Sequence, residues 1–332
     1  MDNLKKVGLT ALAGSLAMFS VSQADITVGG SGEVTYVSEG GDEVNSGNPY
    51  GVSHTISFTG TGELDNGIGY KFYTEMAGVD MTADSSYVQF DMGDMGKFGI
   101  DQGVGQYGIG TIALSIPTAY EEADHAVGSL ADGLDNTGDV QTLGYIGDWL
   151  GANINIEYNP AHGNLVKSQA GGNSSASPKT GTNLNWAVKY AVPGADGLEL
   201  RLGASNTDFA ASTATDDQEI TGAVKYAIGA VSLGYQMSEI QSGTAGTAGE
   251  NVRAYGVAFN VNDNLSISYG RNENESDPTA GGTNVTEKST GIQAAYTMGS
   301  ASLRIAHNEA TGVGAVAAAK DENLEISMSL SF

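Results

Sequence analysis

The sequence has 332 residues, of which 40% are hydrophobic, 16% are charged and none is cysteine, and 39 acids against 14 bases give a formal charge of −25. This acidic excess argues against nucleic-acid binding, which needs cationic groups to displace counterions. The absence of cysteine excludes disulfides, cysteine metal sites and cysteine nucleophiles. The hydrophobic content is high enough for a folded chain rather than a disordered one.

The first 24 residues have the pattern of a secretory signal peptide. Lys5 and Lys6 precede an apolar run from 7 to 21, and small residues end the segment at Ala24. A membrane anchor would need about 20 apolar residues, and this run is shorter. We therefore expect a signal peptide over 1–24 and one mature domain over 25–332.

Alternation of apolar and polar residues dominates the chain from position 25 onward. The final segment shows it clearly, because Leu324, Ile326 and Met328 would lie on one face of a strand and Glu325 and Ser327 on the other. The same count predicts sixteen strands, at 26–37, 52–64, 68–76, 85–92, 97–103, 140–148, 151–159, 184–192, 198–207, 218–228, 230–239, 251–261, 264–274, 287–298, 300–309 and 323–332.

The connections between these strands are alternately short and long. Short links such as 65–67 and 93–96 take turns with long polar links such as 38–49 and 160–183. All short turns then lie at one end of the sheet, as in transmembrane barrels with about ten residues per strand. Because lipid offers no partner to a free backbone amide, such a sheet must close. The pattern predicts an all-β fold, a 16-stranded antiparallel transmembrane β-barrel.

Aromatic residues support the barrel, because they fall on the apolar face and many lie near strand ends, where barrels carry aromatic girdles. The alternative is aromatic packing in the core of a β-sandwich, which leaves the loop asymmetry unexplained. The aromatic residues on the apolar face are Tyr36, Phe58, Tyr70, Phe72, Phe90, Phe98, Tyr158, Trp186, Tyr190, Tyr226, Tyr235, Phe259, Tyr269, Tyr296 and Phe332.

The mature chain resembles the trimeric porins of Gram-negative outer membranes. The resemblance rests on the signal peptide, on "ADITVGGSGEVTYV" and "SSYVQFDMGDMGKFGIDQG", on a long third loop, and on the final Phe332 after "LEISMSLS". It implies a homotrimer in outer-membrane lipid that passes small hydrophilic solutes and ions by passive diffusion, without a cofactor. It also implies that the assembly machinery recognises the last strand and Phe332.

The resemblance further implies that the long link 104–139 folds into the barrel and narrows it. Glu121, Glu122 and Asp124 are then the candidate acids of the constriction, although Pro117-Thr118 replaces the Pro-Glu-Phe-Gly run common in that loop. The alternative is a solvated external loop whose acids have no role. Asp132, Asp135 and Asp139 leave a calcium site as an alternative, because hard cations bind clustered oxygens, but they lack the spacing of an EF-hand loop. We therefore interpret them as solvated acids and expect no metal site.

Six cations fall on the polar face of the predicted strands, where they would meet water in the lumen rather than lipid. Porins commonly set a basic wall against the acidic loop, and Lys71 and Lys97 are the strongest candidates because they precede the loop. The alternative role is simple solvation of the lumen. The six residues are Lys71, Lys97, Lys189, Arg201, Lys225 and Arg304.

A barrel of sixteen strands is wide enough for an aqueous channel, and the acidic excess favours cations. Three alternatives remain: a substrate-specific channel, a plugged structural or adhesive barrel, and a barrel enzyme. An enzyme is the least favoured of these, because the four histidines are scattered and form no recognisable catalytic order.

Overall fold

The structure is a computed structural model. It describes residues 25–42, 47–78, 82–102, 105–113, 115–127, 134, 142–160, 180–209, 216–243, 249–276 and 285–332. The expected signal peptide and the acids Asp132, Asp135 and Asp139 lie outside these residues.

Sixteen strands make up the described fold, as the alternation predicts. Their bounds are β1 Asp25–Gly41, β2 Tyr50–Glu63, β3 Gly69–Ala77, β4 Thr82–Asp91, β5 Lys97–Gln102, β6 Thr142–Trp149, β7 Ala152–Asn159, β8 Thr180–Ala191, β9 Leu198–Phe209, β10 Asp217–Ile228, β11 Val231–Gln241, β12 Glu250–Asn260, β13 Leu265–Ser276, β14 Thr286–Met298, β15 Ala301–Thr311 and β16 Lys320–Ser331. Short 3-10 turns occur at Gly93–Met95, Ile109–Ile112 and Val313–Ala315. Among the described residues, no helix is long and apolar enough to cross a membrane.

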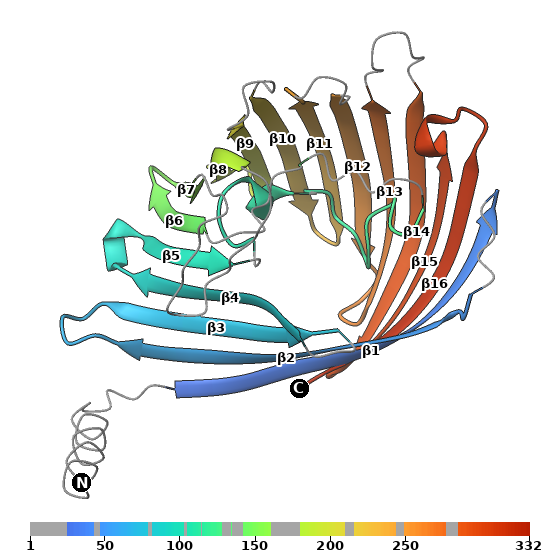
Figure 1. Ribbon diagram of the computed structural model, residues 1–332. Helices are drawn as coiled ribbons and strands as arrows, with labels where there is room; N and C mark the ends of the chain where they lie inside the picture. The colour runs from blue at the N-terminus through green and yellow to red at the C-terminus, as the bar shows by residue number, and fades with distance from the viewer. Residues whose placement is uncertain are drawn as a thin grey trace, which may run out of the picture.

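The strands form one closed antiparallel barrel in which each strand pairs with its neighbours in sequence (Figure 1). The barrel closes where β1 pairs with β16, with Val34 opposite Met328. The last residue takes part in this closure, because the backbone of Phe332 exchanges two hydrogen bonds of 3.0 and 3.1 Å with Gly30. Closure gives the edge strands backbone partners, which a lipid environment requires.

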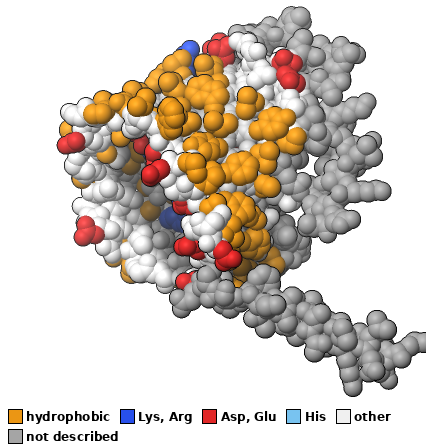
Figure 2. Space-filling view, turned by 90° about the vertical axis from the view of Figure 1, so that its left-hand side faces the viewer, with side chains coloured by type: hydrophobic (Ala, Val, Ile, Leu, Met, Phe, Trp, Pro, Cys, Tyr) orange, Lys and Arg blue, Asp and Glu red, His pale blue; other side chains and the backbone are white. Residues whose placement is uncertain are grey.

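The two faces of the wall differ in polarity, as the period-two pattern predicts. On β8, Leu184 and Trp186 are exposed on the outside, whereas Asn183 and Asn185, which alternate with them, are buried on the inside. Figure 2 shows hydrophobic side chains gathered over the outer face of the strands on the left of Figure 1. An apolar outside and a polar inside are the reverse of a soluble β-protein and suit a wall between lipid and water.

Several strands are longer than the alternation predicts. β1 continues to Gly41 rather than ending at position 37, and β8 begins at Thr180 rather than at 184. Backbone pairing does not need apolar side chains, so the ladder continues past the hydrophobic part of a strand into the polar end of the barrel. These extensions are at the long-loop end, where the connections leave the wall.

Candidate pore constriction

After β5, the described segments 105–113 and 115–127 run across the inside of the barrel, where Figure 1 draws them in green in front of the later strands. Their backbone is bonded to polar side chains on the inner face of five strands. The pairs are Ile109 N with Asn185 Oδ1 on β8 (2.8 Å), Ser115 N with Gln236 Oε1 on β11 (2.5 Å), Ala119 N with Ser268 Oγ on β13 (2.8 Å), Tyr120 N with Gln293 Oε1 on β14 (3.1 Å), and the His125 carbonyl with Asn308 Nδ2 on β15 (3.0 Å).

A row of glycines on the inner wall makes room for this segment. Gly234, Gly256, Gly270 and Gly291 are direct register partners across β11 to β14. A Cβ atom at Gly234 would lie 2.5 Å from Pro117 Cδ, closer than any such contact in a relaxed structure. Gly99 and Gly144 on β5 and β6 likewise leave space for the ring of Tyr107. The segment therefore packs directly against the backbone of the wall.

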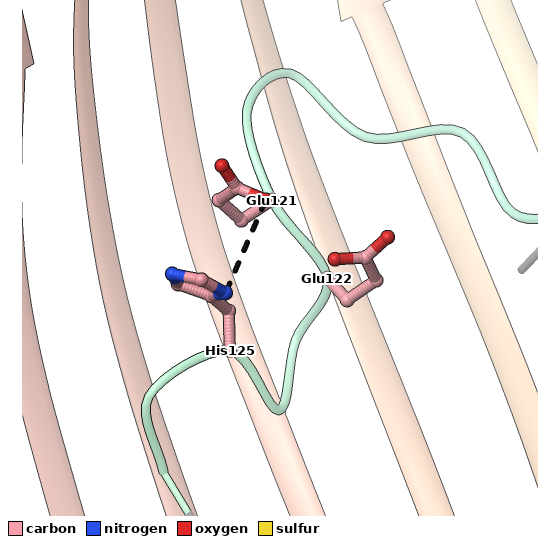
Figure 3. Close-up of side chains that lie close together, drawn as sticks. All are labelled: Glu121, Glu122 and His125. Atoms are coloured by element: carbon pink, nitrogen blue, oxygen red, sulfur yellow. Dashed lines mark ion pairs between the residues drawn. The ribbon is translucent and has the colours of Figure 1, made fainter. Parts of the chain in front are cut away.

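The part of the segment from Tyr120 to His125, the loop tip, carries a network of ionisable side chains. His125 Nδ1 lies 4.0 Å from Glu121 Oε2, and His125 Nε2 lies 3.5 Å from Glu325 Oε2 on β16. The Tyr120 hydroxyl donates a 2.7 Å hydrogen bond to Glu325 Oε1. Figure 3 shows Glu121, Glu122 and His125 around one turn of the loop. Two of the three predicted constriction acids thus lie together at the loop tip.

A cation completes this network from the wall. Arg304 on β15 lies with its guanidinium carbon 4.7 Å from the centre of the Tyr120 ring, and its Nη2 is 3.3 Å from Glu33 Oε1 on β1. Ser327 also donates a hydrogen bond to Glu33 Oε1. Arg304 therefore lies on the same side as the loop acids, in contrast to the expected basic wall opposite them.

The surroundings of the loop tip shift two ionisation equilibria. Burial raises the pKa of Glu121 above the usual glutamate range, and the neighbouring carboxylates of Glu122 and Glu325 raise it further, against the opposing effects of His125 and Arg304. Burial and the hydrogen bond to Glu325 raise the pKa of Tyr120 well above its usual value, so its hydroxyl remains a donor. The tip is therefore a place where negative charge is crowded.

Asp124 differs from its two neighbours. Its side chain is 2% exposed, and its Oδ2 accepts a 2.7 Å hydrogen bond from Asn272 Nδ2 on β13. The carboxylate thus points into the wall and ties the loop to it rather than lining the open space. Odd or even position predicts which way a side chain points only within a strand, not within a loop. The sequence therefore could not show that Asp124 points into the wall while Glu121 and Glu122 do not.

The five other predicted lumen cations lie at different places on the inner wall. Lys189 is the register partner of Arg201, and Lys225 is within electrostatic reach of Arg201, so β8, β9 and β10 share a basic patch. Arg201 ties this patch to the loop, because its Nη1 donates a 3.1 Å hydrogen bond to Ser115 Oγ. The Arg201 Nε atom also donates a 2.5 Å hydrogen bond to Glu199 Oε1.

The two cations favoured from the sequence lie apart from that patch. Lys71 on β3 has its ammonium 5.3 Å from the centre of the Tyr87 ring. Lys97 begins β5 beside a short turn, where its ammonium lies 3.6 Å from Asp91 Oδ2 and is about half exposed. Lys97 therefore lies at the short-turn end of the barrel. The alternation in sequence predicts that its side chain faces inward but not how far along the barrel axis it lies.

Several residues of the network were not singled out in the sequence. Tyr120 and His125 lie within the predicted loop but have no distinguishing spacing. Glu33 and Glu325 alternate with the apolar residues of the first and last strands, so their side chains face the lumen. A comparison of all inward-facing acids, like the one made for the cations, would have found them. Only the closure of β1 on β16 brings them to one site.

Comparison with known proteins agrees with this geometry. Residues 8–331 match the family model described as Gram-negative porin. Three solved structures show the same fold: a porin refined at 1.8 Å (13% identity, TM-score 0.66, covering 93% of this chain and all of that one), Salmonella typhi OmpF in complex with daunomycin (12%, 0.67, 94% and 98%) and an anion-selective porin from Comamonas acidovorans (15%, 0.64, 93% and 100%). A comparison with curated protein sequences gives no match. The family match covers nearly the whole sequence, so the chain belongs to the Gram-negative porin family.

Proposed function

We propose that this chain forms a water-filled pore in the outer membrane, through which small hydrophilic solutes and ions diffuse passively. The observation that carries the proposal is the acid-bearing segment 115–127, which is bonded inside a closed barrel of sixteen strands. A barrel of this size without an inner segment would be a wide opening. The segment gives it a narrow, charged part, and no catalytic group is needed for transport.

The proposed pore prefers cations. Around the loop tip, the carboxylates of Glu33, Glu121, Glu122 and Glu325 gather beside the guanidinium of Arg304. Fixed charges act over roughly 8 Å at physiological salt, so ions that pass this tip experience them. The basic patch of Lys189, Arg201 and Lys225 opposes the preference, but Glu199 offsets part of it.

Export and assembly complete the proposal, and they rest on family membership. Residues 1–24 direct secretion and are removed, the mature chain forms a homotrimer, and Phe332 with the last strand is recognised by the assembly machinery. Phe332 suits this role because the residue is 79% exposed.

Single-channel recording in a planar bilayer tests the pore directly. Folded protein extracted in detergent should give large, stepwise openings that occur in groups of three. Folded protein that leaves the bilayer silent would contradict the proposal and favour a plugged structural barrel. Openings that one class of solute blocks at low concentration would favour a substrate-specific channel.

A further inference from the structure

Three potential metal ligands meet at the loop tip. Glu121, Glu122 and His125 each place one ligand atom so that all three atoms lie within 4.8 Å of one another. In a tetrahedral zinc site, bond lengths of about 2.0–2.1 Å put the ligand atoms roughly 3.3 Å apart. Small side-chain rotations, of the order of 1 Å at the ligand atoms, would therefore bring the three atoms onto one ion.

The imidazole of His125 is oriented as in metal sites. A histidine that binds a metal through one ring nitrogen usually presents the other to a carboxylate, which fixes the tautomer and the ring. His125 Nε2 faces Glu325 Oε2 at 3.5 Å, and the Glu325 side chain is only 7% exposed. The hydrogen on Nε2 is thereby favoured, and the lone pair of Nδ1 is left facing Glu121.

The backbone that carries these ligands is held in place from the wall. Gln293 accepts hydrogen bonds from the amides of Tyr120 and Glu121 and donates one of 2.6 Å to the Glu121 carbonyl. Asn308 donates to the His125 carbonyl, and Asn272 binds Asp124 between them. Ligands on a clamped backbone lose little conformational freedom when an ion binds, which favours affinity.

We propose that Glu121, Glu122 and His125 form a binding site for a divalent transition-metal ion of the zinc type, with Glu325 as the positioning residue behind the histidine. One imidazole and two carboxylates are ligands that zinc accepts, and three protein ligands leave a fourth position for water. The positive charge of the ion would also offset the repulsion between the carboxylates of Glu121 and Glu122. Sequence spacing could not show Glu325 behind the histidine, because Glu325 lies on the last strand and reaches His125 only in the folded barrel.

A second group provides an internal comparison. His307 and Glu309 on β15 and Glu322 on β16 also lie within 4.8 Å of one another. Their side chains are 41%, 60% and 51% exposed, on the outer face of the wall. His307 Nε2 is already 3.1 Å from Glu322 Oε1, with no buried carboxylate described behind the ring. His307 therefore serves as the matched control for His125.

Zinc binding to the folded, detergent-solubilised protein tests the proposal by isothermal titration calorimetry. The unaltered protein, His307→Gln and His125→Gln are compared after removal of any purification tag. We expect His307→Gln to retain the site and His125→Gln to bind one Zn²⁺ fewer per chain. Glu325→Gln should keep the site but weaken it by roughly 10–100-fold, which a merely structural Glu325 would not do.

Three results would overturn the proposal: no Zn²⁺ binding to any of the proteins, equal binding by His125→Gln and the unaltered protein, or loss of the site in His307→Gln alone. Binding does not depend on channel activity, so a protein that binds Zn²⁺ but conducts nothing would refute the proposed function and leave the site intact. If the protein also conducts, Zn²⁺ should reduce the cation preference of His307→Gln and leave that of His125→Gln unchanged.

Discussion

At the scale of single residues, glycines shape the inner wall as much as charged side chains do. Gly234, Gly256, Gly270 and Gly291 lie side by side across four strands and let the loop touch the backbone of the barrel. Any side chain in this row would occupy the space of the loop. The row is visible once the strands are aligned in register, because each glycine has inward parity.

A large side chain in this row should push the loop away from the wall and into the lumen. In Gly234→Leu, the new side chain would overlap Pro117 Cδ, at 2.5 Å from the Cβ position, and Ile116 Cα, at 2.9 Å. We expect lower single-channel conductance and faster proteolytic cleavage of the loop. Gly60→Leu is the control, because Gly60 lies opposite Ile26 on the outer wall with open space around it. Equal conductance of the two variants would show that the loop does not rest on Gly234.

The acids of the loop tip should differ in their effect on ion selectivity. A unit charge about 5 Å from a passing ion contributes about 0.8 kcal/mol in water, and salt screening roughly halves this, which gives about a twofold effect per charge. Because each charge favours cations about twofold and disfavours anions about twofold, Glu121→Gln combined with Glu122→Gln should lower the ratio of cation to anion permeability roughly fifteenfold. Asp124→Asn should change it little, because Asp124 is buried against Asn272. Reversal potentials of the two variants measure this, and a larger effect of Asp124→Asn would contradict the assignment.

At the scale of elements, the loop is held by polar side chains of the wall more than by its own secondary structure. Gln293 on β14 is the clearest anchor, since its buried amide bonds to the backbone at both Tyr120 and Glu121. Backbone groups removed from water need such partners, because an unsatisfied amide is costly. The polar inner face therefore serves as the hydrogen-bonding partner of the loop as well as the lining of a pore.

Removal of this anchor should loosen the loop without opening the barrel. Gln293→Leu takes away four hydrogen bonds to the loop, of which the one to the Glu122 carbonyl is long at 3.5 Å. At about 1 kcal/mol or less for each, with partial replacement by water, the loss costs about 2 kcal/mol. Hydrogen exchange at the amides of Tyr120 and Glu121 should then accelerate roughly thirtyfold. Gln241→Leu is the control, because Gln241 bonds to Glu239 at the exposed end of β11. Unchanged exchange in Gln293→Leu would argue against the anchor.

The last strand has two roles that substitution can separate. The backbone of Phe332 closes the ladder with Gly30, whereas its ring is mostly exposed. Phe332→Ala should therefore leave the stability of the refolded barrel nearly unchanged but lower its yield in the outer membrane, as quantified by membrane fractionation. Leu330→Ala, at another exposed outer position, is the control. Equal yields of the two variants would contradict an assembly role for Phe332.

The number of strands, their faces and the closure of the barrel could be predicted from the sequence, because side-chain alternation has a fixed period of two. The candidate site was predictable only in part. Parity placed Lys97 on the inner face but could not show that it lies at the short-turn end. Nor could it show that Asp124 turns into the wall or that Arg304 joins Glu33 beside the acids. These depend on height along the barrel and on loop contacts between distant segments.

At the scale of the whole molecule, the apolar outer wall, the polar inner wall and the clamped acidic segment form one arrangement. Closure of β1 on β16 creates the wall and also brings Glu33 and Glu325 to the loop tip. The charge at the loop tip is therefore assembled from both ends of the described chain together with the loop. This arrangement is the basis of the proposed cation preference.

The most direct test of that preference is the reversal potential of the unaltered protein in a planar bilayer with a potassium chloride gradient. A cation-preferring pore should give a potential of the sign that potassium alone would produce, and its magnitude should fall as the salt concentration rises and screening increases. A potential of the opposite sign would show that the basic patch on β8 to β10 governs the pore, and it would contradict the account.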